Sequence, residues 1–181
     1  MSREASPRDT RGSELPTLLA NARAELATCH DRLLARWSSL VQAEVCLSPL
    51  RTGPTHHEVL GGWAELAGRV KEDHQLCSKV LGQLHWACRV DSGDIGTPTL
   101  VTETLHTAIT HAASLASCLE AAAHTLHTAG ADPGGLVETA AMCRRFLGAA
   151  QHDLDRVIAD VAQAASLVPP PPQRWHLRAV I

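Results

Sequence analysis

Two His-x-x-Cys pairs stand eleven residues apart in the middle of the chain, at His74/Cys77 and His85/Cys88. Imidazole and thiolate are good zinc and copper ligands, so this spacing raises metal binding as a candidate chemistry. Residues three apart on an α-helix share a face, so each pair can offer two ligands to one ion. The pairs cannot share an ion, because about 16 Å of helix at 1.5 Å per residue separates them.

Each pair would need further ligands from a facing helix, where Cys29 and Cys143 occupy apolar stripes. The other interpretation is plain core packing. A buried cysteine behaves as a small apolar residue, and a histidine can bond a carbonyl or carboxylate across a core. We expect core packing and no cofactor, and we keep metal binding by the two pairs as the alternative. All four residues are predicted to face the core with Trp63 and Leu84.

Four long segments with helical periodicity must position these residues, at 15–47, 56–89, 98–128 and 133–168. Ser48-Pro49 ends the first segment, and Thr55 with Glu58 forms a capping box at the second. Thr97 is the expected cap of the third segment, followed by Pro98, and Asp132-Pro133 starts the fourth. The apolar stripe of the first segment is predicted to include Leu18 and Trp37, with Pro16 in its first turn.

Matched lengths and short connections predict an all-α, up-down-up-down antiparallel four-helix bundle over residues 14–168. Residues 1–13 are charged and aperiodic, so a disordered N-terminal tail is expected there. Residues 169–181 begin with four prolines and form a Pro-rich C-terminal tail, whose Trp175 and Leu177 are expected to dock in a groove. A helical pair that completes its core by dimerising is the alternative fold.

Composition excludes several classes of partner. The net charge is −3 and the pI is near 6.4, so we expect neither a nucleic acid nor a membrane partner. The six cysteines include no C-x-x-C pair, and the chain shows no signal-peptide segment. Reduced thiols in a cytoplasmic protein are therefore expected, with Cys29, Cys77, Cys88 and Cys143 buried and with Cys46 and Cys118 reacting first.

The third segment has an unusual outer face. Between Thr97 and Ala129 there is no Lys or Arg, and the only carboxylates are those of Glu103 and Glu120. A solvent-facing helix normally carries charge, so this face is predicted to be covered, most simply by a second copy in a two-fold homodimer. Protonation of His111 would then weaken association. The face consists of Thr107, Thr110, His111, Ser114, Ser117, Cys118, Ala121, Thr125 and Thr128.

Two short stretches resemble parts of known families. Glu103-x-x-His106 has the spacing used in ferritin-like di-iron bundles, but no second Glu-x-x-His is present. The segment around His124 resembles the start of the histidine phosphotransfer motif, and that resemblance implies a phosphorylated His124. Where that family has Lys and Gly, three and four residues after the histidine, this chain has His127 and Thr128.

No phosphate-binding loop, nucleophile elbow or zinc-protease motif occurs in the chain. We therefore expect a non-enzymatic protein-interaction or regulatory module, self-associating through the third helix. A small His/Cys metal-binding or metal-sensing bundle is the alternative. Arg32 and Arg36 are expected on solvated helix faces, and Trp86 is expected to be exposed.

Overall fold

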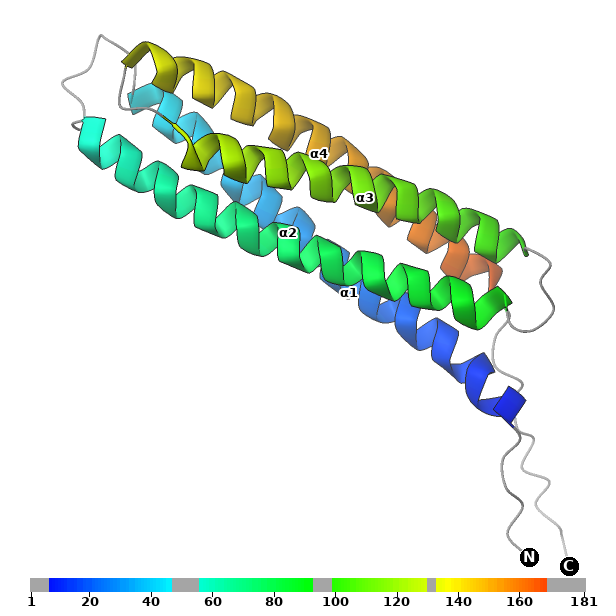
Figure 1. The fold of residues 1–181 in the computed structure, drawn as a ribbon. Helices are drawn as coiled ribbons and strands as arrows, with labels where there is room; N and C mark the ends of the chain where they lie inside the picture. The colour runs from blue at the N-terminus through cyan, green and yellow to red at the C-terminus, as the bar shows by residue number, and fades with distance from the viewer. Residues whose placement is uncertain (1–6, 47–55, 93–98, 130–132, 169–181) are drawn as a thin grey trace, which may run out of the picture.

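The computed structural model describes residues 7–46, 56–92, 99–129 and 133–168, which form an antiparallel four-helix bundle. The four helices lie side by side along one long axis (Figure 1). This architecture confirms the predicted all-α fold. The helices are α1 (Pro7–Cys46), α2 (His56–Ser92), α3 (Leu100–His127) and α4 (Pro133–Leu167).

Two helix starts differ from the prediction. Helix α1 begins at Pro7, inside the segment 1–13 expected to be disordered, and this places Pro16 in the helix interior instead of its first turn. Helix α3 begins at Leu100 with Thr99 as its N-cap, two residues later than the predicted Thr97. The hydroxyl of Thr99 accepts a hydrogen bond from the amide of Thr102 at 3.1 Å.

Asp91 explains why the cap of α3 lies at Thr99. Its carboxylate, near the end of α2, accepts hydrogen bonds from the hydroxyls of both Thr99 and Thr102, the latter at 2.6 Å. The end of α2 is therefore linked to the start of α3 by the hydrogen bonds from the two threonines of the cap to Asp91.

The core is built mainly from leucine, alanine and valine, with Trp63 as its one fully buried aromatic side chain among the described residues. In α1 the core stripe passes through Leu19, while Leu18 is only half-buried. Trp37, predicted in the core, lies at the edge with 36% of its surface exposed. The core stripe of α1 thus follows Leu15, Leu19, Ala22 and Leu26, and Leu18 and Trp37 lie at its edges.

Each helix packs against its neighbours in the sequence, and α1 closes the bundle against α4. Every position on a helix therefore has a defined environment: core, one of two seams, or solvent. None of the described helices contains an apolar stretch of the length that crossing a membrane requires.

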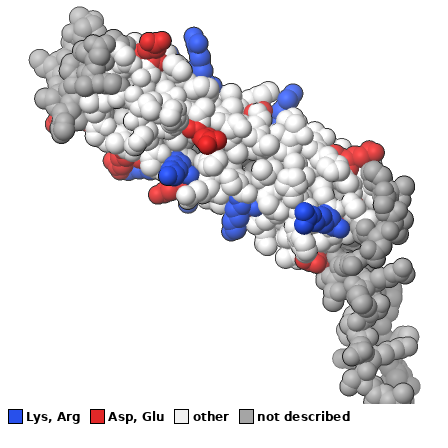
Figure 2. Space-filling model, viewed as in Figure 1, with Lys and Arg blue, Asp and Glu red and all other residues white. Residues whose placement is uncertain are grey.

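On the face shown in Figure 2, uncharged surface predominates, and Lys, Arg, Asp and Glu side chains occur singly or in small groups of mixed sign. This view corresponds to the front of Figure 1, where α2 and α3 lie. The absence of Lys and Arg from α3 contributes to this neutrality. Sequence and surface thus agree that α3 presents little charge of its own.

The glycines of α2 generate a first prediction, on stability. A Cβ added at Gly68 or at Gly82 meets no atom within 4 Å, so neither glycine is needed for packing. Replacing either with alanine is expected to raise the free energy of unfolding by about 0.5–1 kcal/mol, because glycine loses more backbone entropy on folding. Denaturant unfolding of Gly68→Ala and Gly82→Ala measures this. Loss of stability in either variant would mean that its glycine has a packing role.

Candidate functional site

The four predicted metal ligands do not converge. Cys77 and Cys88 are buried, His74 is half-buried, and His85 is exposed, so the prediction that all four face the core is wrong for His85. His85 directly follows the buried Leu84, and one residue turns an α-helix by about 100°, which carries the imidazole out of the core. Among the described residues, no group of three or more His, Cys, Asp or Glu side chains is placed to hold a metal ion.

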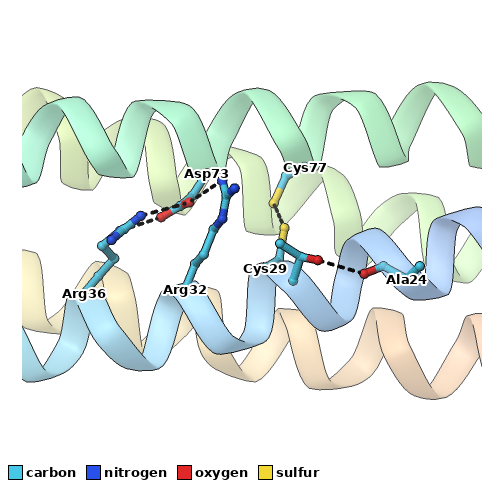
Figure 3. Close-up of polar contacts among 7 residues, drawn as sticks. Ala24, Cys29, Arg32, Arg36, Asp73 and Cys77 are labelled. Carbon is cyan, nitrogen blue, oxygen red and sulfur yellow. Dashed lines mark hydrogen bonds and ion pairs between the residues drawn. The ribbon is translucent and has the colours of Figure 1, made fainter.

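Cys77 instead contacts a thiol on another helix. Its Sγ lies 3.6 Å from the Sγ of Cys29 on α1, and both side chains are buried (Figure 3). The prediction that Cys29, Cys77, Cys88 and Cys143 are buried is confirmed. The direct contact was missed, because it depends on the axial register of α1 against α2.

The hydrogen bond between the two thiols makes Cys29 more acidic and Cys77 less acidic. It lowers the pKa of Cys29, and the nearby guanidinium of Arg32 also lowers it, while burial opposes both. The same hydrogen bond raises the pKa of Cys77, and burial raises it further. Cys29 is therefore the sulfur that more readily gives up its proton.

One turn from Cys77 lies the most deeply buried carboxylate among the described residues, that of Asp73, whose side chain is 2% exposed. Arg36 on α1 donates from Nε at 2.8 Å and from its terminal nitrogen at 3.4 Å (Figure 3). Arg32 adds a longer contact of 3.5 Å. A buried carboxylate needs such partners, because its desolvation would otherwise outweigh the gain from packing.

This ion pair corrects the expectation that Arg36 is solvated, since only 12% of its side chain is exposed. Arg32 remains 43% exposed, in better agreement with the expectation. A signal for the pair was present in the sequence. Asp73 falls on the apolar stripe between Val70 and Cys77, and an acid at a core position requires a basic partner on a facing helix.

The predicted interaction face of α3 is partly covered by α4 of the same chain. His111 Nδ1 lies 2.8 Å from a carboxylate oxygen of Asp160, and Ser114 donates to Asp153 at 2.6 Å. Arg156 lies 3.4 Å from the other ring nitrogen of His111. The charges that α3 lacks are thus supplied across the seam by α4.

Other positions of the same face differ in exposure. Cys118 and Ala121 are half-buried, whereas Thr107, Thr110 and Ser117 are exposed. The hydroxyls of Thr107 and Thr110 donate to backbone carbonyls one turn back, which satisfies them within the helix. Association of two copies through this face stays a prediction, and the area left for it is narrower than the sequence suggests.

A groove of about 440 Å³ lies between α2 and α3. Its floor is made of small side chains, and its rim carries one lysine, three histidines and one glutamate. Exposed His124 thereby lines the same groove as Lys71 of α2, so a cation faces this groove although the position three residues after His124 holds His127. The lining residues are Ala64, Ala67, Gly68, Lys71, His74, Glu120, Ala123, His124 and His127.

On the opposite side of the bundle, four large apolar side chains of α1 are exposed: Leu34, Trp37, Val41 and Val45, called here the α1 apolar patch. Their exposed fractions run from 36% for Trp37 to 50% for Leu34. A small groove of about 240 Å³ beside them reaches Leu147 and Gly148 of α4. The Trp37 ring covers Gly148, where an added Cβ would lie 3.7 Å from it.

The remaining predicted sites fall at the surface or outside the described residues. Trp86 is exposed as predicted, and its indole nitrogen donates to Glu14 at 2.8 Å. Trp175 and Leu177 lie outside the described part of the chain, as does the side chain of Cys46. Their predicted roles are therefore untested.

The buried ion pair supports a prediction by double-mutant cycle. Asp73→Leu alone should destabilise the fold by about 3 kcal/mol, because Arg36 would be left buried without its counter-charge. Asp73→Leu with Arg36→Leu should recover most of that loss. Glu65→Leu, which breaks the surface pair with Arg69, is the control and should cost less than about 1 kcal/mol. Equal destabilisation by Asp73→Leu and Glu65→Leu in urea unfolding would contradict the importance of the buried pair.

Thiol labelling supplies another prediction. Cys118 is half-buried and should react faster than Cys143, whose pKa burial raises to about 12. Burial and then Asp153 also raise the pKa of Cys118, so its labelling rate should climb about tenfold per pH unit between pH 7 and pH 9. Iodoacetamide labelling followed by peptide mapping measures both rates. Faster labelling of Cys143 in the native protein would show that the bundle opens at that position.

The described residues thus offer three distinct features: a buried thiol and ion-pair layer between α1 and α2, a histidine-lined groove between α2 and α3, and an apolar patch on α1. The first can bind a soft ligand or fix helix register, the second can bind a polar ligand, and the third can receive the apolar side of another helix. Comparisons with protein-family models, with curated proteins and with solved structures found no match to this chain.

Proposed function

We propose that this protein is a non-enzymatic interaction module that receives an amphipathic helix of a partner protein on the α1 apolar patch. The observation that carries the proposal is the exposure of Leu34, Trp37, Val41 and Val45 along one side of a single helix. Their spacing of three, four and four residues forms one straight seam, which is the pattern that a docked helix requires.

The surroundings of the patch support an apolar contact. Residues 37–43 of α1 carry no charged side chain, although Ser38, Ser39 and Gln42 are exposed, and the charged residues within the span of the patch are Arg36 and Glu44. Arg36, the nearest described cation on the same helix, is already engaged by Asp73. A partner helix would therefore bury apolar and uncharged polar surface along residues 37–43.

The size of the patch favours a helical segment over a second copy of the whole bundle. Eleven residues of α1 extend about 16 Å, and a helix is about 10 Å wide, so the patch covers roughly 160 Å². A stable dimer usually buries about 800 Å² on each partner. One partner helix of three to four turns matches the patch, and the groove beside Trp37 offers a place for one of its large side chains.

The experiment begins with a photo-crosslinking amino acid at position 41 or 142, in cells that make this protein. Val41 and Met142 are both 40% exposed, but only Val41 belongs to the patch, so position 142 is the matched control. A partner captured at 41 and not at 142 is identified, and its crosslinked segment is synthesised as a peptide.

Calorimetry then decides whether the contact is the proposed one. Binding of the peptide should weaken at least about tenfold in Val41→Glu and stay unchanged in Met142→Glu, because a carboxylate in an apolar seam would lose its hydration. Equal binding by both variants would overturn the proposal. A second copy of this chain as the captured molecule would point to self-association instead.

A further inference from the structure

We propose that Cys29 and Cys77 form a two-thiolate binding site for a soft monovalent metal ion, Cu(I). Their sulfurs approach to 3.6 Å from two different helices, and both side chains are buried, at 3% and 1% exposed. This site is separate from the α1 apolar patch and does not depend on the proposed docking function.

The number of ligands selects the type of ion. Structural zinc takes four ligands, and no group of three or more His, Cys, Asp or Glu side chains is arranged for an ion among the described residues. A monovalent ion with a filled d shell is satisfied by two thiolates in a line. Thiolate sulfur is also the soft donor that Cu(I) prefers to oxygen or nitrogen.

Both signs of charge lie near the thiols. Arg36 is bound closely by the carboxylate of Asp73, whereas Arg32 makes only a longer contact of 3.5 Å with it. A monovalent ion held by two thiolates carries one negative charge, and the guanidinium of Arg32 is the nearby group that would offset part of it. Glu25, on the other side of Cys29, is already paired with Lys79 at 2.5 Å.

Binding releases two protons, because both thiols must become thiolates as the two sulfur–copper bonds form. In the unbound protein the two sulfurs share a hydrogen bond at 3.6 Å, which the ion replaces. The proton of Cys77 leaves as copper takes over the role of that hydrogen bond. To hold the ion in a line between them, the sulfurs must move apart from their separation of 3.6 Å by a small rotation of the two side chains, and the apolar side chains around them keep water away.

The test titrates Cu(I) into the full-length, fully reduced protein under anaerobic conditions, in competition with the chelator bathocuproine disulfonate. Wild-type protein should retain one tightly held equivalent, with an ultraviolet thiolate-to-copper absorption band and a raised melting temperature. Cys29→Ser and Cys77→Ser should each lose that equivalent and the shift in melting temperature.

Two further variants make the result specific. Cys143→Ser removes a buried thiol whose sulfur instead approaches a backbone carbonyl, at 3.7 Å, and should leave the tight equivalent in place. Arg32→Gln keeps both sulfurs and should weaken copper binding about tenfold, because one offsetting charge is gone. Circular dichroism confirms that each variant is folded. Transfer of all copper from wild type to the chelator, or equal loss in Cys143→Ser and Cys29→Ser, would overturn the proposal.

Discussion

The buried carboxylate of Asp73 is the constraint on which the α1–α2 half of the bundle depends. Leucine and alanine side chains can slide past one another with small changes in energy, whereas a buried charge tolerates few positions of its partner. By accepting from Arg36 at 2.8 Å, Asp73 fixes how far α1 is shifted along α2. That register brings Cys29 opposite Cys77 and Glu25 opposite Lys79.

The polar groups of the α3–α4 half follow a different rule. There the seam is held by neutral or paired groups at its edge, with His111 against Asp160 and Ser114 against Asp153. Helix α3 needs no charge of its own because α4 supplies it. The two halves thus combine a charged layer close to the core with a polar seam near the surface, around one continuous apolar interior.

Periodicity and capping residues were enough to predict four helices, because both depend on local sequence, and matched helix lengths with short connections were enough to predict their antiparallel order. Helix ends were less predictable. The cap at Thr99 is decided by Asp91 of the preceding helix, which is a tertiary contact. The candidate sites depended even more on tertiary structure: Cys77 was expected in the core, but its contact with Cys29 needs the register that Asp73 sets. His85 shows a different error. It was assigned to the core face from the periodicity of the whole helix, but its own side chain points to solvent.

The closure of the bundle by α1 against α4 has a consequence for folding. The three main contacts between consecutive helices form across short loops, whereas α1 and α4 meet across the two helices between them, as at Trp37 and Gly148. Loop-closure entropy makes such a long-range contact slower to form. The α1 apolar patch borders the seam between α1 and α4. A partner helix bound there would contact both helices and would therefore slow their separation.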